Sequence, residues 1–252
     1  MADLTRIAPT PSPRTAVVWA VILEELDRRW RSGGDTEPRV LDAGGGTGGF
    51  AVPLAEAGCA VTVIDPSPDA LAALARRAAE RHVGDRITAM QGDADDLAAL
   101  VPAASVDLVL CHSMLEVVED PSRTVAAVAA ALRPGGCASL LVANRAAAVL
   151  SRALAGHFTA AHAVLADPAG RTGGADTVLR RFDVDSITAL AVAAGLAVEQ
   201  VHGVRVLADL VPGAVVDAEP GGLGALLALE HAAAHRPPYR DVATQLHVLA
   251  RR

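Results

Sequence analysis

The chain has 252 residues, of which 52% are hydrophobic and 2% aromatic, and it carries a formal net charge of -7. This length fits one α/β domain, and the acidic balance argues against a broad basic surface for nucleic acid, though not against a local basic cleft. Residues 1–14 hold no apolar signal segment, and no apolar run reaches the ~18 residues that cross a membrane, so we expect a cytoplasmic protein without a membrane partner.

The first part of the chain alternates predicted strands and helices. A helix is predicted over 14–31, strands over 39–42, 60–64 and 86–90, and helical segments between them over 48–58 and 68–82. A fourth strand over 106–110, a helix over 121–132 and a fifth strand over 137–143 follow. Because the strands are continuous apolar runs, this alternation predicts a parallel sheet with helices on both faces.

After residue 143 the strict alternation ends. The pattern predicts helix over most of 145–166, a loop over 167–176, a helix over 184–195 that Asp183 or Asp185 caps, and a strand over 196–207. A loop over 212–224, a helix over 223–235 and a last strand over 244–250 complete the chain.

The cysteines predict neither metal nor disulfide chemistry. Cys59, Cys111 and Cys137 form no CxxC pair, and zinc sites and disulfide frameworks normally show paired spacings. We therefore expect buried thiols and no bound metal ion.

A glycine-rich turn follows the first predicted strand, where residues 40–48 read VLDAGGGTG. Gly44, Gly45 and Gly46 let the backbone turn sharply and approach a ligand closely. Asp42, at the end of the strand, can accept hydrogen bonds from loop amides or from the ammonium group of a ligand. Asp65 ends the second strand about 20 residues later, where a carboxylate can hold both hydroxyls of a ribose; a helix cap is the alternative for Asp65.

The spacing of the glycines distinguishes two kinds of cofactor. It differs from the GxGxxG pattern that holds the pyrophosphate of a dinucleotide, and with an acid two residues before Gly44 it resembles the first motif of class I S-adenosylmethionine-dependent methyltransferases. Residues 91–96, 106–116 and 132–136 resemble the next three motifs of that family in order. The resemblance implies S-adenosylmethionine as the cofactor and methyl transfer as the reaction. A nicotinamide-dependent oxidoreductase and a non-catalytic nucleoside-binding protein are the more distant alternatives.

The chain also resembles one particular family, the tRNA 5-carboxymethoxyuridine methyltransferases, which methylate the carboxylate of a modified wobble uridine. The residues that carry this resemblance are Arg14–Trp19, Leu41–Gly46, His112–Glu116, Asp120, Pro121, Asn144, Gly203–Val206, Asp209, Leu226–Glu230, Pro238, Tyr239 and His247–Arg251. The resemblance therefore spans nearly the whole chain and implies tRNA as a partner.

Both resemblances imply a fold and a division of the chain. We expect a single α/β domain over 1–252, with a Rossmann-like, mostly parallel seven-stranded sheet, helices on both faces and a small inserted cap segment. Residues 1–38 would form a helical lead-in, 39–143 the cofactor-binding core, 144–182 the cap-like segment and 183–252 the C-terminal part of the sheet.

The closer resemblance implies specific roles around the cofactor. Arg14 would pair with the cofactor carboxylate, and Gly44 and Gly45 would contact its methionine portion. Asp65 would hold the ribose. The adenine would be bordered by Ala94 and Asp95, with Asp95 accepting from its amino group, and His112 would lie near the transfer site. A solvated charge for Arg14, a loop acid for Asp95 and a satisfied strand-end histidine for His112 are the alternatives.

Two features of the sequence favour a small-molecule acceptor as the alternative to tRNA. The loop at 165–182 has only three arginines, at 171, 180 and 181, against aspartates at 167 and 176. Ala143 stands where the family has an aromatic residue before Asn144. Both features weaken phosphate contact and base stacking.

The expected acceptor determines which side chains the chemistry needs. A carboxylate is ionised at neutral pH and needs no base, but it needs a cation to hold it. Arg205 is the first candidate, followed by Arg145, Arg180 and Arg181. An amine or hydroxyl acceptor would instead need a general base, for which His112 is the candidate.

Overall fold

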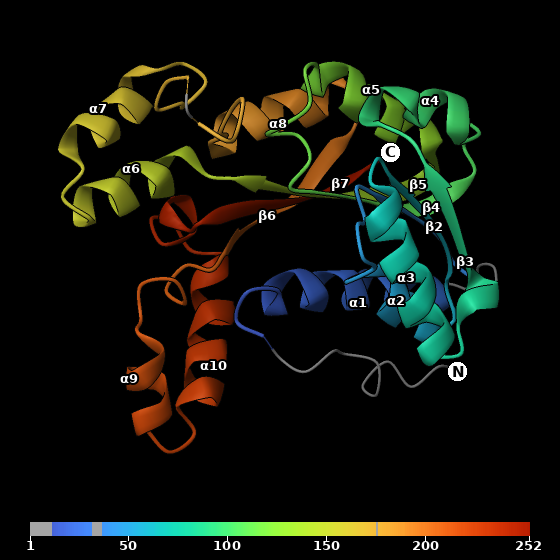
Figure 1. Ribbon diagram of the computed structural model, residues 1–252, viewed down its shortest axis with the longest axis horizontal. Coiled ribbons are helices and arrows are strands. Elements are labelled where there is room, and N and C mark those ends of the chain that lie inside the picture. The colour runs from blue at the N-terminus through green and yellow to red at the C-terminus, as the bar shows by residue number, and fades with distance from the viewer. Residues whose placement is uncertain (1–11, 32–36, 175) are drawn as a thin grey trace.

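The computed structural model describes residues 12–31, 37–174 and 176–252. The residues before 12 and most of the predicted break at 32–38 lie outside this described part. A central sheet runs through the described chain, and helices cover both of its faces (Figure 1).

The described residues form a seven-stranded sheet in the order β3-β2-β1-β4-β5-β7-β6. The strands are β1 (Arg39–Ala43), β2 (Ala60–Asp65), β3 (Ile87–Gln91), β4 (Val106–His112), β5 (Leu132–Ala143), β6 (Ala197–Val204) and β7 (Gln245–Arg251). The first five strands pair in parallel, and β7 runs antiparallel between β5 and β6. The predicted seven-stranded, mostly parallel sheet is confirmed.

Two helical layers bury the faces of this sheet. One contains α1 (Ala16–Arg31), α2 (Ala51–Glu56), α3 (Pro68–Glu80) and α10 (Gly222–Ala234), and the other contains α4 (Leu97–Leu100), α5 (Pro121–Ala131) and α8 (Val184–Ala193). Ile22 and Leu54 pack in the first core, and Val109 and Ile187 pack in the second. The strands read as apolar runs because both faces are covered, as in β4, where six consecutive residues are buried.

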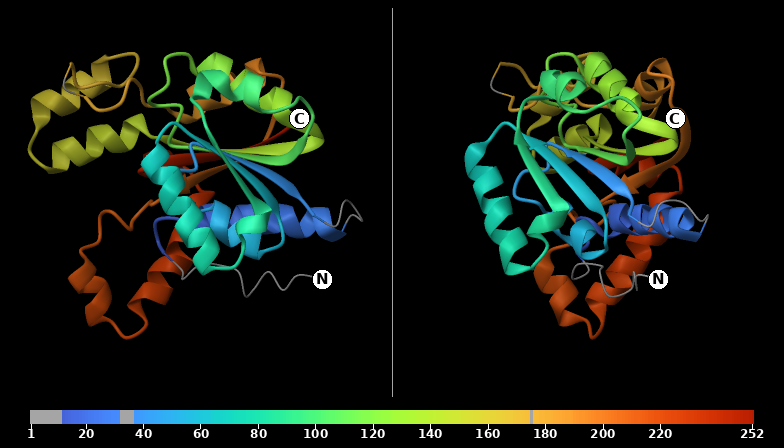
Figure 2. Two further views of the ribbon diagram at one scale, coloured as in Figure 1. Left: turned by 45° about the vertical axis from the view of Figure 1, so that its right-hand side comes forward. Right: turned by 90° about the vertical axis from the view of Figure 1, so that its right-hand side faces the viewer.

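Two helical hairpins project from the end of the sheet where the parallel strands finish. Helices α6 (Arg145–Leu154) and α7 (Phe158–Ala166) follow β5, while α9 (Gly213–Ala218) and α10 follow β6, on the opposite side (Figure 2). Among the described residues, no helix is both long and apolar enough to cross a membrane.

The structure corrects several predicted boundaries. The helix expected over 145–166 is divided, because Gly156 adopts a positive φ of 77° between α6 and α7. The loop expected over 212–224 contains α9, and the last part of the strand expected to reach 207 is irregular after Val204. Asp183 caps α8 as predicted, accepting from the amide of Ser186.

Three short 3-10 helices complete the described structure: η2 (Gly84–Arg86), η3 (Ala94–Asp96) and η4 (Arg240–Val242). Of these, η3 follows β3 after two intervening residues and contributes to one wall of a cavity at the end of the sheet.

Candidate functional site

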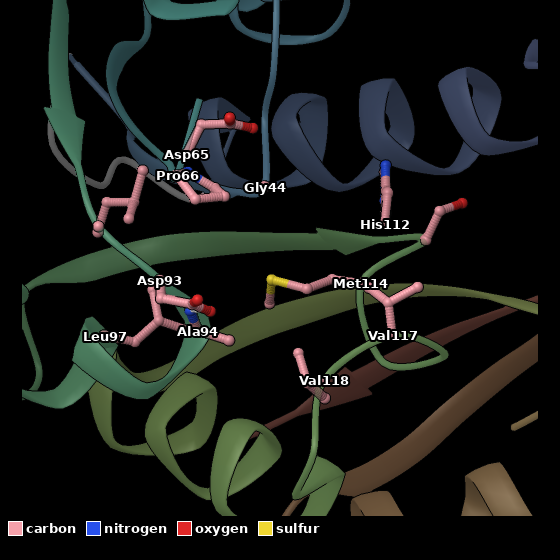
Figure 3. Close-up of a pocket in the computed structure, with 13 residues that line it drawn as sticks. Gly44, Asp65, Pro66, Asp93, Ala94, Leu97, His112, Met114, Val117 and Val118 are labelled. Atoms are coloured by element: carbon pink, nitrogen blue, oxygen red, sulfur yellow. Dashed lines mark hydrogen bonds between the residues drawn. The ribbon is translucent and has the colours of Figure 1, made fainter. Parts of the chain in front are cut away.

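A cavity of about 330 Å3 lies at the carboxyl ends of the parallel strands. The loops that follow four of these strands line it, with residues from 44, 64–66, 92–97 and 112–118. Ligands of open α/β sheets bind at this edge, because the loops there converge on the point where the strand order reverses. Four residues predicted for the cofactor line the cavity: Gly44, Asp65, Ala94 and His112 (Figure 3).

The glycine-rich turn approaches its neighbours too closely for larger side chains. A Cβ atom at Gly45 would lie 2.6 Å from the carboxyl group of Asp42, and one at Gly48 would lie 2.3 Å from Leu74. Gly44 and Gly46 have positive φ values of 75° and 55°, a region that favours glycine. The turn therefore needs glycine at all four positions, and it brings bare backbone to the wall of the cavity.

Asp42 lies beneath this turn and is 3% exposed. Its Oδ2 atom is buried and has no hydrogen-bond partner among the described residues. Burial, and then the nearby charge of Asp65, raise the pKa of Asp42 to about 7. An unpartnered carboxylate oxygen below a cavity is suited to attract a cationic group such as an ammonium.

Asp65 ends β2 and holds two loops with one carboxylate. Its Oδ2 accepts from the amide of Gly46 and its Oδ1 accepts from the amide of Ser67, each at 2.9 Å. The side chain lines the cavity although the residue is 8% exposed. Because each oxygen has a second lone pair, the carboxylate can also accept from two hydroxyls of a ligand.

The structure separates the two residues predicted to border an adenine. Ala94 is buried in the cavity wall, whereas Asp95 lies outside the lining and forms an ion pair with Arg123 at 3.7 Å. Asp93 lines the cavity in its place, at the end opposite His112 (Figure 3). Sequence reasoning did not identify Asp93, although an acid three residues before Asp96 at the start of a helix is a capping-box pattern, and both reciprocal bonds of that box are present.

His112 ends β4 at the other end of the cavity. Its Nε2 contacts the Ser139 hydroxyl at 2.8 Å, while its Nδ1 is buried without a partner among the described residues. The ring meets Phe50 edge-on with centroids 4.8 Å apart. Burial lowers the pKa of His112 to about 3, so the imidazole is neutral at physiological pH and can serve as donor or acceptor at Nδ1.

The structure does not bring Arg14 into the cavity. This residue is exposed just before α1, its side chain is not part of the lining, and its amide donates to the Ser12 hydroxyl at 3.3 Å. The predicted contact with a cofactor carboxylate therefore stays a prediction.

Arg205 directly follows β6 and is not among the residues that line the cavity. Its guanidinium pairs with Asp209 at 3.1 Å, its Nε is buried without a partner among the described residues, and its φ is 58°. The amide of Thr244 donates to the carbonyl of Arg205, and the next residue, Gln245, donates to the cavity-lining Ser113 hydroxyl at 3.1 Å. The start of β7 thus links Arg205 indirectly to a residue of the cavity lining.

The other candidate arginines have structural partners. Arg145 pairs with Asp183, and Arg181 pairs with Asp176, whose pKa is lowered mainly by that hydrogen bond. Arg180 donates to carbonyls of Leu115, Val118 and Glu119 and so braces the loop that lines the cavity after His112.

The cysteines and the acidic side chains show no metal-binding arrangement in the described chain. All three cysteines are buried and none forms a disulfide, which confirms the predicted buried thiols. Within the described ranges, no group of three or more His, Cys, Asp or Glu residues could hold a metal ion.

Comparisons with known proteins agree on the class of enzyme. Residues 40–136 match a family model described as a methyltransferase domain. The chain is 30% identical to a tRNA 5-carboxymethoxyuridine methyltransferase from Escherichia coli (strain K12) over 239 residues, which are 95% of this chain and 88% of that protein. A ubiquinone biosynthesis O-methyltransferase from Aromatoleum aromaticum is 39% identical over 120 residues, about half of each chain at 48% and 50%.

The fold of nearly the whole chain is similar to that of a solved structure. An S-adenosylmethionine dependent methyltransferase from Mesorhizobium loti superposes with a TM-score of 0.60 at 25% identity, covering 96% of this chain and all of the other. The similarity to this structure and to the Escherichia coli relative thus extends beyond the loops around the cavity to the C-terminal half.

Proposed function

The chain belongs to the class I S-adenosylmethionine-dependent methyltransferase family, and from that premise we propose that it methylates the carboxylate of 5-carboxymethoxyuridine in tRNA. One observation carries this acceptor. The similarity to the tRNA-modifying relative covers 95% of the chain, whereas the similarity to the ubiquinone-pathway relative covers 48% of it. Acceptor recognition in this fold depends on the segments outside the cofactor loops, and of these two relatives the tRNA-modifying one matches those segments.

The residues around the cavity fit S-adenosylmethionine. Asp65 would hold the ribose hydroxyls, and the unpartnered Oδ2 of Asp42 would attract the ammonium group from beneath the turn. Gly44 and Gly45 would admit the methionine portion, and Asp93 and Ala94 would border the adenine. When bound, the cofactor supplies a methyl group that its sulfonium has already activated.

The protein's own task is then to align the acceptor with that methyl group. A carboxylate acceptor is ionised at neutral pH, so no side chain has to remove a proton. His112 stays neutral because it is buried, and it can hydrogen-bond at the transfer end of the cavity. Arg205 would leave Asp209 to hold the acceptor carboxylate.

The test is transfer of labelled methyl from S-adenosylmethionine to tRNA that carries 5-carboxymethoxyuridine, followed by nucleoside mass spectrometry. The matched control is the same tRNA with unmodified uridine at the wobble position. We expect a methyl ester on the modified nucleoside. Mild alkali should release its label, because it hydrolyses esters, and the control tRNA should receive no label. Absence of transfer, with binding of S-adenosylhomocysteine intact, would contradict the tRNA acceptor.

A small-molecule acceptor is the second candidate, and one observation favours it. Five arginines near the cap-like segment and the adjacent ends of β6 and β7 pair with an aspartate: Arg145 with Asp183, Arg171 with Asp167, Arg181 with Asp176, Arg205 with Asp209 and Arg240 with Asp241. Such pairing leaves little excess positive charge for a phosphate backbone.

Salt dependence separates the two acceptors. A protein that neutralises several phosphates loses tRNA affinity steeply as salt rises, because bound counterions are released on binding. A steep slope would support the tRNA acceptor. No measurable tRNA binding would support a small carboxylate or hydroxyl acceptor.

A further inference from the structure

Three histidines and a serine form a buried polar row on one face of the sheet. The row begins at His112 on β4, continues through Ser139 on β5 and His247 on β7, and ends at His202 on β6. Ser139, His202 and His247 are each 0% exposed. Four buried polar groups in line are costly unless they satisfy one another.

The strand register explains why these side chains meet. His112 lies opposite Leu141 on β5, and His247 lies opposite Leu141 from the other side. Ser139 is two residues before Leu141 and therefore shares its face of the sheet. Its hydroxyl reaches Nε2 of both imidazoles at 2.8 Å, while His202 is the direct cross-strand partner of His247, with their Nδ1 atoms 3.2 Å apart.

The surroundings keep the imidazoles of the row neutral. Burial is the largest cause that lowers the pKa of His112 to about 3 and of His202 to about 4, and it also lowers the pKa of His247. The charges of His235 and Arg240 lower the pKa of His202 further. Each ring of the row therefore carries one proton, on one of its two nitrogens.

One proton per ring permits two arrangements that satisfy every contact. In the first, His202 donates to His247, His247 donates to Ser139, and Ser139 donates to Nε2 of His112, which leaves a proton on Nδ1 of His112. In the second, every donor and acceptor is reversed, and Nδ1 of His112 is a free acceptor. The two open ends are Nδ1 of His112 and Nε2 of His202, the two imidazole nitrogens of the row that are buried without a partner among the described residues.

We propose that Ser139, His247 and His202 are positioning residues that, with His112, form one proton-ordered hydrogen-bond chain between the cavity and the far edge of the sheet. The direction of this chain sets whether His112 presents a donor or an acceptor at Nδ1. A ligand group that needs a donor at His112 therefore leaves Nε2 of His202 as an acceptor. A ligand group that needs an acceptor at His112 leaves a proton on Nε2 of His202, beside the His235 ring, whose centroid is 4.6 Å from that of His202.

The proposal rests on the proposed methyltransferase site only in that His112 lines its cavity. Its test needs no turnover, so failure of the chain and failure of the proposed acceptor are distinguishable. The readout is the 15N spectrum of the protein labelled in histidine, because protonated and unprotonated imidazole nitrogens have well-separated shifts. Loss of signals in His112→Gln, His202→Phe and His247→Gln assigns the rings.

The decisive experiment asks whether a change at His202 affects His112 when the Ser139 hydroxyl is present and when it is absent. In the wild-type background, His202→Phe should move the nitrogen shifts of His112, although two strands lie between them. In Ser139→Ala the same His202 substitution should leave His112 unmoved. Ser113→Ala removes a hydroxyl beside His112 that is not part of the hydrogen-bond chain. In this variant, His202→Phe should still move the nitrogen shifts of His112. Insensitivity of His112 to His202→Phe in the wild type, or equal sensitivity in Ser139→Ala, would overturn the proposal.

A second measurement covers the case in which His202→Phe does not fold. S-adenosylhomocysteine added to the wild-type protein should move the shifts of both His112 and His202, whereas in Ser139→Ala it should move those of His112 only. Scalar coupling across the bond between the Nδ1 atoms of His202 and His247 should be detectable in the wild type. A His202 response that survives in Ser139→Ala, or absence of that scalar coupling, contradicts the chain.

Discussion

The carboxylate of Asp65 fixes the amide of Gly46 across a separation of 19 residues, with Oδ2 and the nitrogen 2.9 Å apart. This bond connects the end of β2 to the turn after β1, so one side chain both shapes the glycine-rich turn and faces the cavity. Shape and ligand contact at this site therefore depend on the same group.

Replacement of Asp65 by Ala should weaken binding of S-adenosylhomocysteine on the order of 100-fold or more. The variant loses charge-assisted hydrogen bonds that are each worth roughly 1.5–3 kcal/mol, and it releases the amide of Gly46. Isothermal titration calorimetry measures the change. Asp69→Ala, which removes an exposed acid in the first turn of α3, is the control and should bind normally. An unchanged dissociation constant in Asp65→Ala would remove this residue from the ribose site.

Binding of the same ligand should depend on pH through Asp42. The pKa of this carboxyl is about 7 in the ligand-free protein, and a ligand ammonium would favour the ionised form. Affinity should therefore rise with pH, by up to about tenfold per unit, until it levels above about 7. His112 cannot produce this trend because its pKa is about 3. Asp42→Asn should bind weakly with no such pH dependence; a wild-type curve that is flat from pH 5 to 8 would contradict the assignment.

Asp42 should also make the ligand-free protein less stable as the pH rises. Folding raises the pKa of Asp42 to about 7. Between the ordinary pKa of an aspartate and about pH 7, the folded protein therefore binds more protons than the unfolded chain. The free energy of unfolding falls as the pH rises across this range. Asp42→Asn should thus raise the thermal midpoint relative to wild type at pH 8, with a stabilisation of up to roughly 4 kcal/mol. The gain should be much smaller at pH 4. Equal midpoint differences at both pH values would refute this account.

A methyl group added at Gly45 should weaken cofactor binding although it changes no charge. Its Cβ would lie 2.6 Å from the carboxyl group of Asp42 and 3.0 Å from Val63, so either the turn or the carboxylate must move. We expect Gly45→Ala to weaken cofactor binding at least tenfold, an effect of about 1.4 kcal/mol. Gly49→Ala is the matched control in the same turn, because a Cβ there meets nothing within 4 Å. Similar binding by both variants would show that the close approach at Gly45 has no functional role.

The sequence predicts the cofactor half of this molecule well because local patterns determine it. Continuous apolar strands and the glycine spacing specify the strand-turn-helix unit at 39–56, and strand-end acids such as Asp65 follow directly from it. The break at Gly156 was missed because glycine is also tolerated within helices, and only the backbone conformation with φ of 77° distinguishes the two cases.

Contacts between distant segments were harder to predict. The ion pair of Arg145 with Asp183, which lies 38 residues further along the chain, depends on which segments lie together in the fold. The ion pair of Asp95 with Arg123 and the place of Asp93 in the cavity wall depend on the turn of η3, and the adenine contact of Asp95 stays a prediction. The row from His112 to His202 depends on strand order and register across four strands, and no local pattern in the sequence contains that information.

Removal of Arg205 tests the acceptor site apart from the cofactor site. Arg205→Ala should leave S-adenosylhomocysteine binding unchanged, because the residue lies outside the cavity lining. It should lower kcat/KM for a carboxylate acceptor on the order of 100-fold, since an acceptor charge left unpaired costs several kcal/mol. Arg171→Ala is the control, because this arginine also pairs with an aspartate four residues away, Asp167, but lies in the loop after α7. If Asp209→Ala, which frees the guanidinium, keeps activity while Arg205→Ala loses it, the arginine acts on the acceptor itself. If Arg205→Ala and Asp209→Ala lose activity equally, the ion pair serves the fold, and the cation that holds the acceptor lies elsewhere.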